Sequence, residues 1–195
     1  MKTLVALVLL LVPQLVAAHG PAEHAQAGTG VTVEPERLVL PNLPVTDRFG
    51  NRTGFRDALP QGRTVILSFT YTACETLCDI SNAVLTVVDA DLGSGLERAA
   101  TIVTVAIDPL RDTPKAMEAE AEKLGAGPDW LWLTGGAQAT KPLLEALRFP
   151  VGAVEDHDPM FLVGRPCRGQ FTRVVGLVDP EALVELAQAQ PACDG

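Results

Sequence analysis

The residues that most often build metal and redox sites are scarce in this chain of 195 residues, which contains four cysteines and three histidines. Basic residues are outnumbered as well, with 15 Lys and Arg against 24 Asp and Glu, so the formal net charge is −9. This acidity argues against nucleic acid or an anionic membrane surface as a partner. The chain has no internal repeat, and its 47% hydrophobic content predicts one packed domain rather than a disordered chain.

Only one apolar run is long enough to suggest export or membrane insertion, and it lies at the N-terminus. Residues 1–18 combine Lys2, an apolar stretch and a small-residue ending at Ala18, which predicts a secretory signal peptide cleaved after Ala18. An uncleaved anchor is the weaker alternative because Pro13 and Gln14 interrupt the run. We therefore expect an exported protein in the periplasm or an equivalent oxidising compartment. It would meet a membrane only through its partner or an uncleaved N-terminal segment.

Residues 19–35 are rich in Gly, Ala and Pro and lack hydrophobic periodicity, which predicts a flexible lead-in. Cleavage would leave His19 as the new terminus, with His24 five residues later. A free amino group beside an imidazole is a candidate copper ligand set. Histidines in a mobile tail are more often simply solvated.

From residue 36 to residue 195 the sequence alternates strand-like and helix-like segments. A Phe-Gly-Asn turn within residues 43–55 predicts a hairpin, and Asp179-Pro180 opens the last helix. Strands are expected at 63–71, 100–108, 129–135, 159–164 and 170–178, the last two as an antiparallel pair, and helices at 76–92, 112–127, 140–149 and 180–188. This order predicts an α/β fold, a thioredoxin-like three-layer sandwich with a central mixed sheet and an N-terminal hairpin.

Two of the four cysteines lie in "TVILSFTYTACETLCDIS", where a buried strand passes into a helix. A thiol near a helix N-terminus has its thiolate form favoured, which suits a nucleophile or a metal ligand. Three residues separate Cys74 from Cys78, so both sulfurs can face one side of a helical turn and close a disulfide or bind one ion. A purely structural bridge is disfavoured because so short a loop constrains little of the unfolded chain. Glu75 and Asp79 add negative charge that favours a bound cation.

A third ligand is available in "VEDHDPMFLVG", just before a predicted strand. His157 is the only histidine outside the tail, and this loop is expected at the same sheet edge as the cysteine junction. Two thiolates and one imidazole suit Cu(I), with zinc as the other candidate metal, and Asp156 could orient the site. The alternative is an ordinary loop histidine. Met160 is expected to pack in the core.

Three segments together resemble the Sco/SenC family of copper proteins. They are "FTYTACETLCDIS" with its CxxxC, "VAIDPLRDTP" after the next strand, and "EDHDPMFLVG" with its Asp-His pair, in the family's order. The resemblance covers roughly residues 36–190.

The resemblance implies a thioredoxin-like fold that binds copper through Cys74, Cys78 and His157, as Cu(I) and with Cu(II) as a second state. It further implies copper delivery during assembly of cytochrome c oxidase, so the expected partner is a copper-receiving oxidase subunit. Family members are also implicated as thiol-disulfide reductases that prepare the oxidase's binuclear copper site. Asp108 and Asp112 would support the site from a neighbouring loop.

The sequence departs from the family's usual pattern at three positions. Glu75 and Asp79 replace the prolines that usually follow each cysteine, and Asp158 stands where serine is common. These changes alter loop stiffness and local charge. They point to another copper client, or to redox work without copper, as alternatives.

The remaining cysteines lie in a turn between the last two predicted strands and in the tail after the final helix. A Cys167–Cys193 disulfide would pin the C-terminus against the sheet and stabilise the fold by about 3 kcal/mol. Surface thiols serving redox relay or a second copper site are the alternative.

Two functions therefore follow from the sequence. The favoured one is an exported copper metallochaperone. The alternative is a thiol-disulfide oxidoreductase in which one cysteine attacks a partner disulfide and the other resolves the mixed disulfide. A peroxide-reducing enzyme is disfavoured because the chain lacks a peroxidatic motif.

Overall fold

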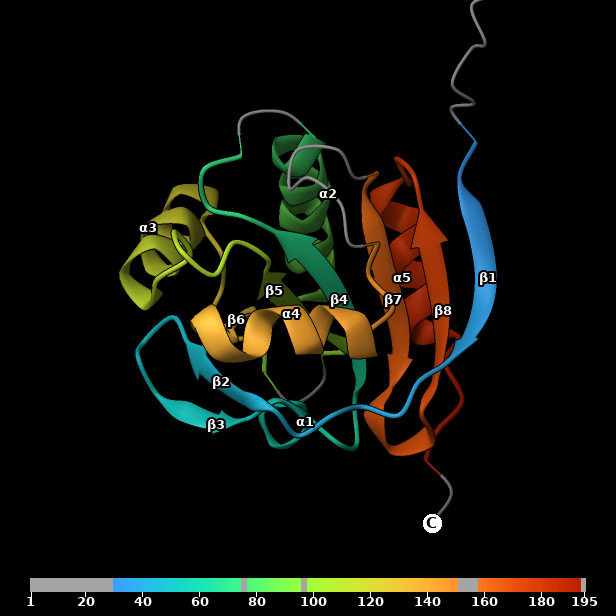
Figure 1. The fold of residues 1–195 in the computed structure, drawn as a ribbon. Helices are drawn as coiled ribbons and strands as arrows, with labels where there is room; N and C mark the ends of the chain where they lie inside the picture. The colour runs from blue at the N-terminus through green and yellow to red at the C-terminus, as the bar shows by residue number, and fades with distance from the viewer. Residues whose placement is uncertain (1–29, 75–76, 96–97, 151–157, 194–195) are drawn as a thin grey trace, which may run out of the picture.

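The computed structural model describes residues 30–74, 77–95, 98–150 and 158–193 (Figure 1). The strands are β1 (Thr32–Arg37), β2 (Pro44–Asp47), β3 (Arg52–Gly54), β4 (Thr64–Thr70), β5 (Ala100–Ala106), β6 (Leu131–Thr134), β7 (Met160–Arg165) and β8 (Gln170–Val175). The helices are α1 (Phe55–Ala58), α2 (Leu77–Leu92), α3 (Pro114–Leu124), α4 (Gly136–Ala146) and α5 (Pro180–Gln188), with a 3-10 turn η1 (Pro166–Arg168). None of the helices in these described ranges combines the length and the apolar character needed to cross a bilayer. The signal peptide expected at residues 1–18 lies outside the described part of the chain.

The strands form one mixed sheet in the order β1-β8-β7-β4-β5-β6-β2-β3. The three central strands β4, β5 and β6 are parallel, and β7, β8 and β1 continue the sheet antiparallel on one side. Every residue of β4 and β5 is buried, as expected for strands covered on both faces. The predicted central mixed sheet is therefore confirmed.

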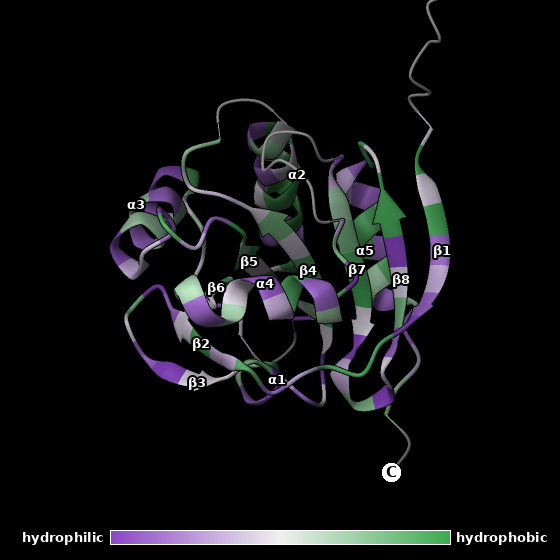
Figure 2. Cartoon of the chain, in the orientation of Figure 1, coloured by the Kyte–Doolittle hydropathy of each residue, from purple (hydrophilic) through white to green (hydrophobic). Residues whose placement is uncertain are grey.

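Helices cover the two faces of this sheet, which makes three layers (Figure 1). Successive residues of a strand point to opposite faces, so Val65 and Leu67 of β4 pack with α1 and α4, whereas Ile66 packs with α2, α3 and α5. Figure 2 shows hydrophobic residues along the strands and on the helices, where they alternate with hydrophilic ones. The two apolar cores thus hold the helices on opposite sides of the sheet.

The hairpin predicted within residues 43–55 is present as β2 and β3. Its turn is held by the Asp47 carboxylate, whose Oδ1 accepts hydrogen bonds from the backbone N–H groups of Phe49 (2.9 Å) and Asn51 (2.8 Å). Gly50 has φ +87°, which explains why glycine occupies this turn. β2 then pairs with β6, so the hairpin extends the sheet at one edge.

The two ends of α3 are defined by capping residues. The Thr113 side chain accepts a hydrogen bond from Ala116 N at 3.2 Å, Pro114 occupies the first turn of α3, and Gly125 ends the helix at φ +67°. α4 differs from expectation because it begins at Gly136 rather than near residue 140. Its N-terminus is shaped by Gly136 at φ +56°, and Gly136 N donates to Thr134 Oγ1 at 3.1 Å.

One sequence prediction is wrong at the N-terminal side. The flexible lead-in was expected to extend through residue 35, but Thr32–Arg37 forms β1, paired along its whole length with β8. β1 is almost entirely exposed and therefore has no alternating apolar pattern that could mark it as a strand. Backbone pairing with β8, rather than side-chain burial, places it in the sheet.

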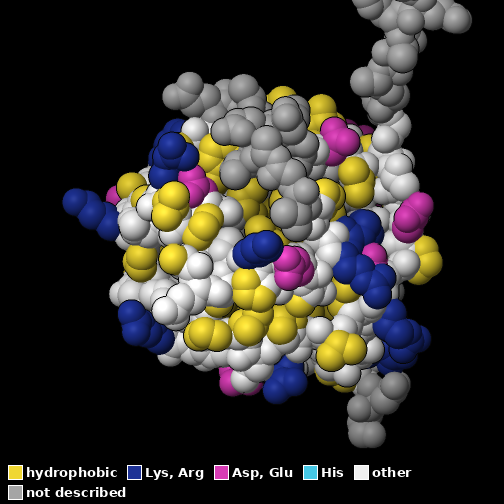
Figure 3. All heavy atoms as spheres, in the orientation of Figure 1, with side chains coloured by type: hydrophobic (Ala, Val, Ile, Leu, Met, Phe, Trp, Pro, Cys, Tyr) yellow, Lys and Arg dark blue, Asp and Glu magenta, His cyan; other side chains and the backbone are white. Residues whose placement is uncertain are grey.

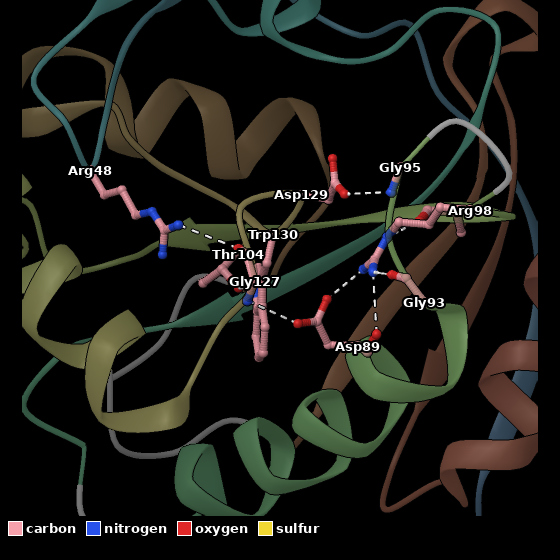
Figure 4. A network of polar contacts seen from close by, with 10 residues as sticks. Arg48, Asp89, Gly93, Gly95, Arg98, Thr104, Gly127, Asp129 and Trp130 are labelled. Carbon is pink, nitrogen blue, oxygen red and sulfur yellow. Dashed lines mark hydrogen bonds and ion pairs between the residues drawn. The ribbon is translucent and has the colours of Figure 1, made fainter.

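A polar network joins the end of α2 to the loop before β5 and to the loop before β6 (Figure 4). The Arg98 guanidinium forms an ion pair with the Asp89 carboxylate at 2.5 Å, and the other Asp89 oxygen accepts from Gly127 N at 3.0 Å. Next to it, Trp130 Nε1 donates to Thr104 Oγ1 at 2.8 Å. Trp130 and Trp132 are both buried, so they serve packing.

Candidate metal centre

Cys74 and Cys78 lie where β4 gives way to α2. Cys74 follows the turn after β4, and Cys78 belongs to the first turn of α2. Their sulfurs form a disulfide with a Cα–Cα distance of 5.8 Å. The two thiols differ in access, because Cys78 is 3% exposed whereas Cys74 is half-buried. Cys78 N also lies 3.3 Å from Cys74 Sγ, so a backbone N–H at the helix N-terminus would stabilise negative charge on that sulfur after reduction.

Asp112 ties the cysteine loop to the loop after β5. Its Oδ1 accepts hydrogen bonds from Thr72 N at 2.8 Å and Thr72 Oγ1 at 2.9 Å, two residues before Cys74. Its Oδ2 accepts from Asp108 N at 2.8 Å. β4 and β5 are parallel, so their carboxyl ends meet at one sheet edge, where ligand sites of open α/β sheets usually lie. A single buried carboxylate therefore fixes the spacing of the two loops.

Asp108 shapes the second loop from within. Its Oδ1 accepts from the N–H groups of Leu110 (2.9 Å) and Arg111 (3.2 Å), and its Oδ2 receives the Arg111 guanidinium at 2.9 Å. Burial works against ionisation of Asp108, but these hydrogen bonds outweigh it and hold its pKa below the ordinary value.

The environment of Asp112 acts in the opposite direction on its pKa. Burial raises the pKa of Asp112, and the nearby charge of Asp108 adds to the rise, although hydrogen bonds from Thr72 and Asp108 oppose it. The two carboxylates of the loop therefore differ in how readily they ionise, and Asp112 is the more costly one to keep charged.

The start of β7 lies at the same sheet edge as the cysteines. β7 runs antiparallel to β4 with Phe161 opposite Ser68, so Met160 at the start of β7 lies near the end of β4 that leads to Cys74. His157 itself lies outside the described residues, as do Asp156 and Glu75. Among the residues that the structure does describe, no group of three or more His, Cys, Asp or Glu side chains could hold a metal ion.

The sequence profile of the SCO1/SenC family matches residues 44–182, which include both cysteines, the Asp108–Asp112 loop and His157. The chain belongs to the SCO1/SenC family.

Comparison with individual proteins agrees with this assignment. A Stutzerimonas stutzeri protein described as a candidate copper-binding protein is 28% identical over 120 residues, which cover 62% of this chain and 57% of the relative. The match thus spans little more than half the length of that relative.

The fold of this SCO1/SenC protein is shared with solved structures. Yeast Sco1 superimposes with a TM-score of 0.62 at 24% identity, covering 76% of this chain and 90% of the yeast chain. Bradyrhizobium japonicum ScoI, solved with copper bound, gives a TM-score of 0.62 at 20% identity, covering 79% and 99% of the two chains. The predicted thioredoxin-like fold is confirmed.

Two further residues of this SCO1/SenC chain can be placed near the candidate centre. Asp79, which replaces a family proline, is exposed in the first turn of α2. Met160 is buried in one apolar core, and its Sδ accepts from Arg173 Nη1 at 2.6 Å. Met160 therefore packs in the core, as the sequence predicts.

The other cysteine pair lies far from this centre. Cys167 in η1 and Cys193 in the C-terminal tail form a disulfide with a Cα–Cα distance of 6.0 Å, so none of the four cysteines is free. This bridge returns the tail after α5 to the turn between β7 and β8.

Sequence reasoning missed Thr72. It gave Asp112 only a supporting role and did not identify Thr72 as its partner, because 40 residues separate the two in the sequence. A Thr directly before a cysteine turn, combined with an acidic loop after the next parallel strand, is the signal that could have suggested the contact.

Proposed function

We propose that this SCO1/SenC protein carries copper as its cargo and delivers it, after export, to a respiratory copper site such as that of a cytochrome c oxidase subunit. Cys74, Cys78 and His157 are the proposed ligands. The observation that carries the proposal is the cysteine pair at a helix N-terminus, anchored through Thr72 by the buried Asp112 carboxylate. The relatives described as a candidate copper-binding protein and solved with copper bound support copper as the cargo.

The donor chemistry fits this cargo. Two sulfurs that can close a disulfide can also contact one ion, and soft thiolates with an imidazole favour Cu(I). Two electrons must first reduce the Cys74–Cys78 disulfide, because only thiolates serve as strong ligands. The half-buried Cys74 then offers a receiving protein access for ligand exchange, while Cys78 is held in the interior.

The test is an anaerobic titration of the reduced full chain with Cu(I) against a competing chelator. We expect one tight equivalent in the wild type and its loss in Cys74→Ala, Cys78→Ala and His157→Ala. The matched control is the Cys167→Ser/Cys193→Ser variant, which removes two other cysteines and should keep the tight equivalent. Absence of tight binding in the wild type would overturn the proposal.

A second candidate function is thiol-disulfide exchange, favoured by the observed Cys74–Cys78 disulfide and by the unequal exposure of its two sulfurs. In the reduced protein the Cys74 thiolate would attack a partner disulfide, forming a mixed disulfide and releasing one partner thiolate. Cys78 would then attack Cys74 Sγ, releasing the second partner thiolate and closing the Cys74–Cys78 disulfide, so two electrons pass to the partner.

This order of attack can be tested with oxidised glutathione as the partner. Cys78→Ser should accumulate a mixed disulfide on Cys74, whereas Cys74→Ser should react slowly because Cys78 is buried. His157→Ala should exchange thiols at nearly the wild-type rate, which separates this function from copper binding. Faster trapping on Cys78 than on Cys74 would contradict the assigned roles.

A further inference from the structure

A cleft of about 330 Å³ lies at the end of the sheet opposite the cysteine junction, between the sheet and the tail after α5. Arg165 ends β7 and Arg37 ends β1, and both are paired with Gln170 of β8 between them. Residues opposite one another in neighbouring strands project from the same face, so these three side chains form one row. Arg168 of η1 completes the basic lining.

Glu36, the one carboxylate among the described residues that line this cleft, is already neutralised by other groups. Glu36 accepts hydrogen bonds from Arg148 Nη1 at 2.7 Å and from Arg173 Nε at 2.9 Å. Within the described residues, neither Arg37 nor Arg165 has a carboxylate within ion-pair distance. Arg165 donates to the Gly62 carbonyl at 2.8 Å, while its buried Nε has no hydrogen-bond partner. The cleft therefore keeps a positive charge and an unused donor.

The positive charge extends to a neighbouring cleft. Arg165 also borders a hollow of about 620 Å³ together with Arg63 and Arg98. Asp89 neutralises Arg98, whereas the hydrogen bond of Arg63 within the described ranges goes to the uncharged Gly95 carbonyl, at 3.4 Å. On the face drawn in Figure 3, basic side chains lie beside β8 and β1 with acidic side chains among them. This end of the molecule is thus locally basic although the chain as a whole has a charge of −9.

The Cys167–Cys193 disulfide builds one wall of the cleft. Gln190 and Pro191 of the tail line it, and the disulfide fastens the tail three residues after Gln190. Arg168 Nη1 donates to the Ala192 carbonyl at 2.9 Å, which holds the tail against the same turn. Reduction of this disulfide would remove the covalent link between tail and turn, so the wall would loosen.

We propose that this cleft is a binding site for a phosphate-bearing small anion and that the Cys167–Cys193 disulfide maintains it. Guanidinium groups bind phosphate through paired hydrogen bonds, and Arg37 and Arg165 approach the cleft from β1 and β7. A site with more than one positive charge should bind a phosphate dianion more tightly than a ligand that carries a single carboxylate. The amides of Gln170 and Gln190 supply neutral donors for the remaining oxygens. The site is separate from Cys74 and Cys78 and does not depend on the proposed copper function.

The test is calorimetric titration of the oxidised full chain with inorganic phosphate at low ionic strength. We expect one saturable site in the wild type and affinity lower by about tenfold or more in Arg165→Gln, because a charge-assisted pair of hydrogen bonds is lost. Arg52→Gln, which changes an exposed arginine of β3 at the other edge of the sheet, is the matched control and should bind within about twofold of wild type. Equal losses in both variants, or no saturable binding, would overturn the proposal.

Two further experiments test the role of the disulfide and the alternative of a lipid ligand. Cys167→Ser/Cys193→Ser should weaken phosphate binding by about tenfold while far-ultraviolet circular dichroism stays unchanged, and unaltered affinity would refute the part assigned to the disulfide. Sedimentation with phosphatidylglycerol vesicles but no binding of inorganic phosphate would replace the small-anion site with a membrane-docking surface. Cu(I) affinity should be unchanged in Arg165→Gln, so this test is independent of the copper site.

Discussion

The buried ion pair between Asp89 and Arg98 should be the most costly single polar contact to break in this protein. The Arg98 side chain is 2% exposed and that of Asp89 is 12% exposed. Arg98 also donates to the carbonyls of Ala100 at 2.7 Å and Asp89 at 3.2 Å, and to that of Gly93. The pair therefore joins the end of α2 to the segment that enters β5 (Figure 4).

The cost of removing one partner can be estimated from this geometry. Asp89→Ala leaves a buried guanidinium without its counter-charge, which costs about 3–5 kcal/mol. It also leaves Gly127 N–H without its acceptor, for about 1 kcal/mol more. At about 2–4 °C per kcal/mol for a chain of this size, Asp89→Ala should lower Tm by roughly 8–24 °C.

The double variant Asp89→Leu/Arg98→Met distinguishes the cost of leaving one buried charge unpaired from the net contribution of the ion pair to the free energy of unfolding. Apolar side chains of similar size remove both charges, and such exchanges are often nearly neutral. We therefore expect the double variant to be more stable than Asp89→Ala. The free energies would come from urea unfolding followed by circular dichroism at neutral pH.

A surface pair provides the control. Lys141 and Glu145 lie 3.9 Å apart with side chains 77% and 54% exposed, so Lys141→Ala should change stability by less than about 0.5 kcal/mol. The reasoning would be refuted if Asp89→Ala cost less than 1 kcal/mol, on the scale expected for a surface pair. A double variant as unstable as the sum of both single changes would also refute it.

Three further predictions concern the second disulfide and the acidic loop. Cys167→Ser/Cys193→Ser should lower the unfolding free energy by about 3.5 kcal/mol, because the bridge closes a loop across 26 residues, and thermal melts without reductant would measure the loss. Asp108 has a lowered folded-state pKa, so its contribution is present above its unfolded pKa of 3.8 and is lost as pH falls through the folded pKa. The stability difference between wild type and Asp108→Asn should therefore shrink in acid, and a difference that stays constant with pH would contradict this assignment. Asp112→Asn should weaken Cu(I) binding by about tenfold without changing its stoichiometry, since an amide can still accept from Thr72 but cannot accept from Asp108 N. Chelator competition would measure this effect, and unchanged affinity would argue against a positioning role for Asp112.

Much of the fold was predictable because burial leaves a strong pattern in its central elements. β4 and β5 are buried along their entire lengths, and near-continuous apolar runs reveal such strands. α3 has a threonine cap, a first-turn proline and a terminal glycine, each with a direct geometric reason. β1 has no such signal because its place in the sheet depends on backbone pairing with β8.

The candidate site was predictable only in part, for a similar reason. The spacing of Cys74 and Cys78 indicates a paired function whatever the fold around it. The contact between Asp112 and Thr72 leaves only an indirect signal in the sequence, because it depends on the register that places the ends of β4 and β5 side by side. The spacing of neighbouring residues can be read directly from a sequence, whereas a contact between distant loops becomes visible only when the pairing of the strands is known.

Trp130 and Trp132 also determine which structural changes the intrinsic fluorescence of this protein can detect. They are its only two tryptophans, both are buried, and their rings lie 5.8 Å apart in the core beneath α2 and α3. Intrinsic fluorescence should therefore be blue-shifted in the native state and should report the loss of this one core on unfolding. Events at the arginine cleft should leave the emission nearly unchanged, so an optical assay there needs an introduced fluorophore.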